Sequence, residues 1–262
     1  MAKNTALITG ASRGIGRELA IVFAENQCDV VLVARSSIEL EQLKNRLEAE
    51  YNISVHTIVK DLSLPQSPQE IFNELKRYKI DVNFLVNNAG FGDYGAFVET
   101  EWERYQKMIA LNITTLTHLC QLFAQDRIAQ RKKGRILNLS SMAAFQPGPM
   151  MAVYFATKSF VLSLSEAIGS EFKKEGITVT ALCPGPTSTN FGKESKMSAS
   201  ELVNNVKISS ARDVAIVGYK AMMKGKPMAI EGTRNKLIPT LVRLLPRRFV
   251  TWMSAKVMSR KN

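Results

Sequence analysis

The stretch ALITGASRGIG, residues 6–16, sets an apolar run directly before three closely spaced glycines. Residues 6–9 have the apolar character of a buried strand, and the segment after the glycines has the apolar spacing of a helix. In such a turn the glycines permit a tight bend, a close approach of the backbone to a pyrophosphate, and close packing of helix on strand. Gly10, Gly14 and Gly16 therefore predict a dinucleotide-binding turn at the start of an α/β fold.

Short apolar runs alternate with longer segments of helical spacing along the rest of the chain. The runs expected to be strands are residues 6–9, 29–34, 54–59, 82–88, 134–141 and 176–183. Helical spacing is present in Ile38, Leu40, Leu43 and Leu47, and again in Ile71, Phe72 and Leu75. Such alternation predicts right-handed βαβ units and a parallel sheet covered on both faces. We therefore expect a doubly wound, Rossmann-like α/β fold of three layers in a single domain.

The composition is that of an ordinary globular protein. Hydrophobic residues make up 45% and charged residues 22% of the chain, which argues against the disordered and fibrous classes. Cys28, Cys120 and Cys183 are odd in number and widely spaced, which favours buried free thiols in a reducing compartment over disulfides or a metal site. No segment approaches the roughly 18–20 apolar residues of a membrane span, and the N-terminus has no signal-peptide pattern. We expect a cytoplasmic protein without a metal ion.

The positive charge is concentrated at the C-terminal end. The formal net charge is +12, but eight basic residues and no acidic residue follow Glu231, which leaves only +4 for residues 1–231. We therefore divide the chain into a Rossmann-fold domain, residues 1–232, and a basic tail, residues 233–262. Polar residues dominate 188–210, which we expect to form a substrate lid.

The tail has the pattern of a basic amphipathic helix. Phe249, Trp252, Met253 and Val257 can form one helical face. The cations expected elsewhere on the helix are Arg247, Arg248, Lys256 and Arg260. Three interpretations remain open: peripheral contact of residues 239–262 with a membrane surface, packing on a neighbouring subunit, and a cap over the substrate cleft. No nucleic acid partner is expected, because no stacking platform or recognition motif accompanies the charge.

Further motifs follow the glycine turn in a fixed order. They are Asn87-Asn88-Ala89-Gly90, Ser141, the pair Tyr154-x-x-x-Lys158, and Pro184-Gly185-x-x-x-Thr189. With the TGxxxGxG spacing of the turn, this order over residues 5–191 resembles the classical short-chain dehydrogenase/reductase family. It is similar to the branch of 3-oxoacyl reductases and hydroxysteroid dehydrogenases. The resemblance implies an oxidoreductase that interconverts a carbonyl and an alcohol with the 4-pro-S hydride of a nicotinamide cofactor. It also implies a homodimer or homotetramer.

The end of the second expected strand distinguishes the two nicotinamide cofactors. An acidic residue there would bind the ribose hydroxyls and repel the 2′-phosphate of NADP. The sequence instead has Ala34 followed by Arg35, and Arg13 lies within the glycine turn as a second cation. Both arginines can make charge-assisted contacts to a phosphate, so we expect NADP(H).

The resemblance assigns the remaining residues of the cofactor site. Asp61 and Leu62, after the third expected strand, match the pair that contacts adenine. The full expected set is Gly10, Ser12, Arg13, Gly14, Ile15, Gly16, Arg35, Asp61, Leu62, Asn88, Ala89, Gly90, Tyr154, Lys158, Pro184, Gly185, Thr187 and Thr189.

Tyr154 and Lys158 lie four positions apart and so share one face of a helix. A phenol ordinarily ionises near pH 10, and an adjacent cation is expected to lower that pKa so that Tyr154 acts as general acid in reduction and base in oxidation. By resemblance, Ser141 hydrogen-bonds the substrate carbonyl oxygen and Lys158 binds the nicotinamide ribose. Asn112 would hold a water that links Lys158 to solvent. The expected catalytic residues are thus Asn112, Ser141, Tyr154 and Lys158.

The residues that flank these motifs indicate a lipophilic substrate. Phe91, Met150, Met151 and Phe191 are expected to line the pocket, with no cation among them to receive a small carboxylate. The candidates are a 3-oxoacyl thioester, a steroid-like ketone and a retinal-like aldehyde, which suggests lipid metabolism. The alternative function is an NADP(H)-sensing or membrane-associated regulatory protein without catalysis on the same fold.

Overall fold

The computed structural model describes residues 3–189, 191–195, 208–232 and 235–259. Within them, seven strands form one parallel sheet in the order β3-β2-β1-β4-β5-β6-β9. The strands are β1 (Thr5–Thr9), β2 (Asp29–Ala34), β3 (Val55–Val59), β4 (Val82–Asn87), β5 (Gly134–Leu139), β6 (Ile177–Cys183) and β9 (Met228–Ile230). The expected doubly wound α/β fold in a single domain is confirmed.

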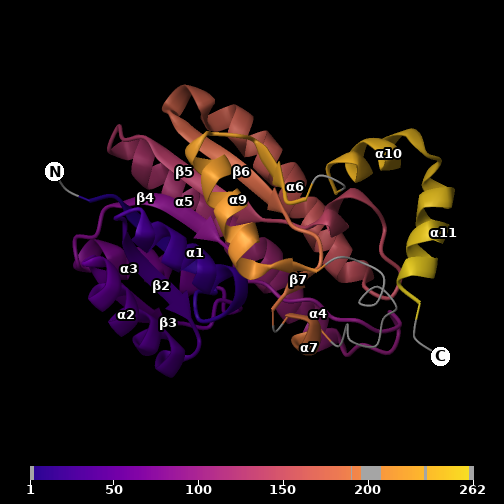
Figure 1. Ribbon diagram of the computed structural model, residues 1–262, viewed down its shortest axis with the longest axis horizontal. Helices are drawn as coiled ribbons and strands as arrows, with labels where there is room; N and C mark the ends of the chain where they lie inside the picture. Colours follow the sequence, from indigo (N-terminus) through magenta and orange to yellow (C-terminus); the bar gives the residue numbers. More distant parts are fainter. Residues whose placement is uncertain (1–2, 190, 196–207, 233–234, 260–262) are drawn as a thin grey trace.

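Helices cover the sheet on both faces (Figure 1). One face is covered by α1 (Gly14–Glu25), α2 (Ser37–Tyr51) and α9 (Ala211–Met223). The other is covered by α3 (Ser67–Arg77), α5 (Leu116–Ala129) and α6 (Ala152–Glu171). Helix α4 (Trp102–Ile109) continues through a π-helical turn, η1 (Ala110–Thr115), into α5, and two short 3₁₀ helices, η2 (Met142–Phe145) and η3 (Phe172–Glu175), flank α6. The fold thus has the expected three layers.

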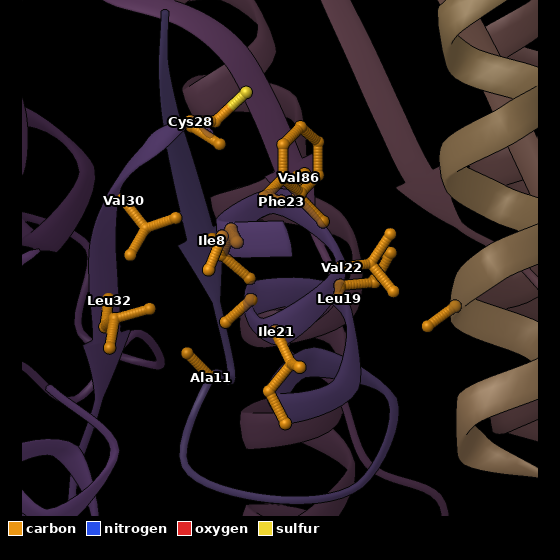
Figure 2. Packing of buried hydrophobic residues seen from close by; sticks show 14 of the residues in the cluster. Ile8, Ala11, Leu19, Ile21, Val22, Phe23, Cys28, Val30, Leu32 and Val86 are labelled. Carbon is orange, nitrogen blue, oxygen red and sulfur yellow. The ribbon is translucent and has the colours of Figure 1, made fainter. Parts of the chain in front are cut away.

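The continuous apolar run of β2 follows from burial on both sides. Val30 and Leu32 point into the core under α1 and α2, whereas Val31 and Val33 point into the core on the opposite face. Figure 2 shows part of the core under α1 and α2, where the side chain of Phe23 in α1 lies among side chains of the strands. Full burial of each such side chain contributes roughly 1.5–3 kcal/mol.

Three details differ from the sequence-based expectations. Ile38 lies in α2 but is 70% exposed, because a position two residues before Leu40 is rotated by about 200° around a helix. β5 ends at Leu139, so Ser140 and Ser141 belong to the connection after the strand. Strand β9 was not expected, because three residues are too short for a periodic pattern.

The topological switch point lies between β1 and β4. The chain leaves β1 into α1 on one face of the sheet, whereas the helices after β4 cover the other face. In open α/β sheets, ligands bind in the crevice at the carboxyl ends of the strands at such a point. The connections after β1 and β4 therefore frame the place to search for a site.

The expected lid, residues 188–210, is described only in part. Residues 190 and 196–207 lie outside the described residues. At its two ends, β7 (Thr187–Ser188) pairs in parallel with β8 (Ser209–Ser210), and α7 (Phe191–Glu194) is a single short helix. The two ends of this segment are therefore held together.

The C-terminal segment forms η5 (Asn235–Leu237), α10 (Ile238–Leu244) and α11 (Arg247–Val257). These helices lie at the end of the molecule remote from α2 and α3 (Figure 1). None of the helices in the described part of the chain is long and apolar enough to cross a bilayer.

Candidate active site

The glycine turn after β1 has a shape that other residues would disturb. Gly10 has φ +65°, and a Cβ at this position would lie 2.7 Å from Nδ2 of Asn88. A Cβ on Gly16 would lie 2.2 Å from the carbonyl oxygen of Gly10. The Asn88 amide in turn donates to the carbonyl oxygens of Thr9, at 2.9 Å, and Gly10, at 3.2 Å. The turn is therefore held between the ends of β1 and β4.

The turn opens onto the N-terminus of α1. The residue at its N-cap, Arg13, is extended and provides no side-chain hydrogen bond to the first helical N–H groups. Those N–H groups carry the positive end of the helix dipole, and together with a close backbone approach they suit a phosphate group. The turn therefore fits the pyrophosphate of a dinucleotide.

A groove of about 670 Å³ runs along this edge of the sheet. The expected site residues that line it are Gly10, Ser12, Arg13, Gly14, Ile15, Arg35, Asp61, Leu62, Asn88, Ala89, Gly90, Phe91, Thr189 and Phe191. Residues that we did not expect also line it: Ala34, Ser36, Lys60, Ser63, Arg104, Lys107, Leu111 and Leu139. Residues from the connections after β1, β2, β3, β4 and β6 thus meet in one groove, whose volume is typical of ligand sites.

The groove is strongly cationic. Its lining includes five cations, Arg13, Arg35, Lys60, Arg104 and Lys107, and one carboxylate, Asp61. The backbone N–H and hydroxyl of Ser63 hold the pKa of Asp61 below its usual range, so this carboxylate is ionised at neutral pH. The excess of positive charge suits a ligand with several phosphates. Arg104 and Lys107 could not be assigned from the sequence, because a helical Arg-x-x-Lys spacing is common on solvated surfaces.

Three of these cations form ion pairs: Arg104 pairs with the buried carboxylate of Asp93, whereas the pairs of Arg13 and Lys60 lie at the groove rim. The guanidinium of Arg13 lies 3.1 Å from a carboxylate oxygen of Glu39, and the ammonium of Lys60 lies 2.9 Å from one of Glu70. All four side chains remain substantially exposed, and such pairs contribute little, typically about 0–1 kcal/mol. The carboxylates paired with Arg13 and Lys60 can therefore be exchanged for a ligand phosphate at small energetic cost.

The catalytic candidates converge beside the groove. Ser141 follows β5, and Tyr154 and Lys158 lie on α6. The side chains of Ser141 and Tyr154 are hydrogen-bonded to each other, and Ser141 Oγ also accepts from the N–H of Ala143 at 3.1 Å. Ser140 Oγ instead donates to the backbone carbonyl of Lys158 at 2.9 Å. The structure thus separates the two serines, and Ser141 is the one beside the phenol.

Burial governs the titration of both residues on α6. Enclosure raises the pKa of Tyr154 to about 12, and the hydrogen bond from Ser141 opposes this shift. Burial lowers the pKa of Lys158 to about 8. The Lys158 ammonium donates to the carbonyl oxygen of Leu139 at 2.7 Å and lies 5.7 Å from the centre of the Tyr154 ring. The expected lowering of the Tyr154 pKa by Lys158 is not found, because burial raises the pKa of the phenol and the opposing contribution comes from Ser141.

Asn112 lies in the π-helical turn η1 and is buried. Its amide donates to the carbonyl of Phe91 at 2.9 Å and to Oγ1 of Thr157 at 3.1 Å, and its oxygen accepts from the N–H of Phe91. Asn112 Oδ1 and Lys158 Nζ both lie close to Gly90. These three hydrogen bonds use both amide hydrogens and one of the two lone pairs of Oδ1, so a relay water would bind the remaining lone pair or a backbone atom of Asn112.

The connection after β6 lies across the glycine turn. The carbonyl of Pro184 accepts from the N–H of Met142, and Thr187 Oγ1 donates to the carbonyl of Gly185. A methyl carbon of Thr189 would lie 3.2 Å from a Cβ placed on Gly14. Of the expected cofactor residues in this connection, Thr189 therefore lines the groove beside the glycine turn, whereas Pro184, Gly185 and Thr187 are not part of the groove lining.

A compact apolar cluster lies on the other side of Tyr154. It consists of Tyr94, Ala143, Met151, Phe155 and Met258, with Met150 and Tyr154 packed against it. The ring of Phe191 lies 5.3 Å from that of Tyr154, so Phe191 contacts both this cluster and the groove.

The four expected substrate residues are therefore divided between the groove and the apolar cluster. Phe91 and Phe191 line the groove, and Met150 and Met151 belong to the apolar cluster. Tyr94 and Met258 were not expected in this cluster, and they are joined by a hydrogen bond of 2.7 Å from the Tyr94 hydroxyl to the Met258 carbonyl.

No group of three or more metal-binding side chains occurs among the residues for which the structure gives positions. Cys28, Cys120 and Cys183 are buried free thiols, and burial raises the pKa of each. They have the character of core residues.

Comparisons with known proteins show what the chain is similar to. The sequence model described as short chain dehydrogenase matches residues 4–199. The very-long-chain 3-oxoacyl-CoA reductase of Rattus norvegicus is 29% identical over 241 residues, which cover 89% of this chain and 75% of that protein.

Solved structures show the same similarity. A short-chain dehydrogenase from Sphingobium yanoikuyae in complex with NADPH superposes with a TM-score of 0.83 and 31% identity over 92% of each chain. The bulky-bulky ketone specific alcohol dehydrogenase from Comamonas testosteroni superposes with a TM-score of 0.77 and 28% identity over 94% of this chain and 96% of its own.

Proposed function

The chain belongs to the classical short-chain dehydrogenase/reductase family, an oxidoreductase family that acts on CH–OH and C=O groups, and from this premise we propose an NADP(H)-dependent reductase of lipophilic ketones or aldehydes. The proposal rests on one observation, namely that the catalytic residues lie next to the groove that fits the cofactor. The hydrogen-bonded pair Ser141–Tyr154 and the buried Lys158 adjoin a cationic groove that begins at a glycine turn.

We assign one role to each catalytic residue. A nicotinamide cofactor held in this groove would supply the hydride for the carbonyl carbon. Tyr154 donates its phenolic proton to the carbonyl oxygen, and the Ser141 hydroxyl hydrogen-bonds that oxygen and fixes its position. Lys158 binds the nicotinamide ribose, and its ammonium offsets the negative charge left on Tyr154. Asn112 holds the backbone at Phe91 and so supports the groove wall.

The preference for NADP(H) rests on the end of β2. Arg35 lines the groove directly after Ala34, where an acidic residue would exclude the 2′-phosphate. Arg13 and Lys60 lie on the same groove, and their ion pairs with Glu39 and Glu70 lie at its rim. The solved relative from Sphingobium yanoikuyae binds NADPH, which supports the same choice.

The substrate class is proposed from the apolar cluster and from the relatives. Met150, Met151 and Phe155 lie beside Tyr154 and present no charge to a substrate. The curated relatives named very-long-chain 3-oxoacyl-CoA reductase support a 3-oxoacyl thioester, and the Comamonas enzyme named for bulky-bulky ketones supports a large ketone. Both fit a role in lipid metabolism.

We further propose a homodimer or homotetramer in the cytoplasm, peripheral to a membrane surface. Exposed apolar side chains on α4, α5 and α6, namely Trp102, Ile128 and Phe160, support association of subunits. Three free thiols support a reducing compartment. Residues 1–232 would carry catalysis, with a lid at about 188–210, and residues 233–262 would form the tail that contacts the membrane.

A screen of NADPH consumption tests the proposal. Aliphatic ketones, aldehydes and 3-oxoacyl thioesters of increasing chain length should be reduced at increasing rates, and Tyr154→Phe should lower kcat by about 10²–10⁴-fold. If no carbonyl compound is reduced while NADPH still binds, the protein is a sensor instead. If Tyr154→Phe retains full turnover, the assigned proton donor is wrong.

A further inference from the structure

Helix α11 has two faces of different character. Val250, Ser254 and Met258 follow a spacing of four and are buried against the body of the protein. The adjoining face carries Phe249, Trp252, Met253 and Val257, which are between 44% and 53% exposed. Leu241 and Leu244 of the preceding helix α10 are also exposed. The segment thus presents large apolar side chains to its surroundings although its inner face is already packed.

The same segment is uniformly basic. No acidic residue follows Glu231, and the cations that the structure describes there are all exposed: Lys236, Arg243, Arg247, Arg248 and Lys256. Lys256 does not lie apart from the apolar face, as the sequence suggested, but at its centre, with its ammonium 4.1 Å from the centre of the Trp252 ring. A lysine stem laid along an aromatic ring, with the charge at the outer end, is the arrangement expected at a boundary between apolar and charged surroundings.

From this combination we propose that the outer face of α10 and α11 docks on an anionic lipid surface. A second copy of the chain is a poor occupant, because a two-fold contact would bring each basic face against itself. An anionic bilayer offers negative charge at the headgroups and apolar depth for Phe249 and Trp252. Helices that lie in the plane of the interface need no membrane-spanning length, in agreement with the short α10 and α11.

The inner face of α11 connects this surface to the active site. Met258 belongs to the apolar cluster with Met151 and Phe155, and its carbonyl accepts from the hydroxyl of Tyr94. Because a helix with its side chains is about 10–12 Å across, docking would bring the cluster within about one helix diameter of the lipid. A lipophilic substrate dissolved in the bilayer would then have a short path to Tyr154. This last step rests on the proposed reductase function, whereas docking develops the proposed membrane contact and does not depend on catalysis.

The two tryptophans of the chain give a site-specific test. Trp102 and Trp252 are 61% and 53% exposed, but Trp102 lies between Glu101 and Glu103, whereas Trp252 contacts Lys256. Full-length Trp102→Phe retains Trp252 as its single indole, and Trp252→Phe retains Trp102. Each variant is titrated with vesicles of phosphatidylcholine alone and of phosphatidylcholine with phosphatidylglycerol. We expect the fluorescence of Trp252 to shift to shorter wavelength on the anionic vesicles and that of Trp102 to stay unchanged.

Charge removal provides a second measurement with a matched control. Arg247→Gln with Arg248→Gln should weaken binding to anionic vesicles by roughly 25-fold, at about five-fold per cation. Lys173→Gln with Lys174→Gln removes two exposed adjacent cations after α6 and should leave vesicle binding unchanged.

Several outcomes would overturn docking. They are no shift of Trp252 on anionic vesicles, an equal shift on neutral vesicles, and a shift that follows protein concentration without lipid, which would identify a second copy as the occupant. A shift produced by an acidic protein but not by lipid would likewise reject the bilayer. Failure of the proposed reductase activity would appear only in the NADPH screen and would leave these lipid measurements intact.

Discussion

Ser140 and Ser141 are chain neighbours whose hydroxyl groups have different partners. One is bonded to the backbone of α6 and the other to the Tyr154 phenol. We expect Ser141→Ala to lower kcat by roughly 10²–10³-fold, since it removes a hydrogen bond to the reacting oxygen. Ser140→Ala should instead lower the free energy of unfolding by about 1–3 kcal/mol, because it leaves a buried carbonyl with one bond fewer. Steady-state kinetics and denaturant unfolding of both variants check this contrast, and a larger kinetic loss in Ser140→Ala would reverse the assignment.

Arg35 determines the cofactor preference at the same scale. Arg35→Asp should raise the KM for NADPH by roughly 10–100-fold, because it replaces a charge-assisted hydrogen bond to phosphate with repulsion. The KM for NADH should fall or stay constant, since an aspartate can accept hydrogen bonds from the ribose hydroxyls. Glu39→Gln is a useful companion variant, because it frees Arg13 from its ion pair and should slightly strengthen NADPH binding. Equal changes of both KM values in Arg35→Asp would place the phosphate elsewhere.

At the scale of elements, the hydroxyl of Tyr94 fastens the end of α11 to the loop after β4. We expect Tyr94→Phe to raise the amide hydrogen exchange of residues 250–258 by roughly 5–10-fold, since the loss of one buried hydrogen bond corresponds to about 1 kcal/mol. Tyr105→Phe is the matched control. It removes a bond from a buried tyrosine to the carbonyl of Phe97 and should leave exchange in α11 unchanged. Equal exchange in both variants would mean that packing alone holds α11.

The sequence alone was sufficient to predict those elements that depend on a few adjacent residues. The glycine turn, the strand runs and the spacing of Tyr154 and Lys158 each depend on a few adjacent positions, and all were found. The contact of Tyr94 with Met258 joins positions 164 residues apart, and nothing in either local pattern announces it. The pKa of Tyr154 was misjudged for the same reason, because its desolvation comes from the surrounding fold rather than from its helix.

At the scale of the whole molecule, the burial of Lys158 lowers the free energy of unfolding, although we propose that catalysis requires this residue. Its pKa is lowered from 10.5 to about 8 by burial, so between these values the unfolded chain binds more protons than the folded one. The contribution of Lys158 to the free energy of unfolding therefore rises as the pH increases from about 8 to 10.5. The whole rise is about 3 kcal/mol. Lys158→Met should be more stable than the parent at pH 7, and the difference should narrow over that window.

Denaturant unfolding of both proteins at several pH values measures this difference. The thiols and Tyr154 also titrate in alkali, but they are common to both chains and cancel in the comparison. A stability difference that stays constant from pH 7 to pH 10 would contradict a lowered pKa for Lys158.

The position of β1 between β2 and β4 has a consequence for the order of assembly. β2 follows β1 after one helix, but β4 begins only at Val82, so the second edge of β1 lacks its partner until that residue has been synthesised. At roughly 5–20 residues per second, this interval lasts on the order of ten seconds on a ribosome. The bonds from Asn88 that hold the glycine turn form only after it. During synthesis, the glycine turn is therefore completed only when the segment with Asn88 has been made. Until then β1 has an unpaired edge, so the nascent N-terminal third is the part that most needs protection from aggregation.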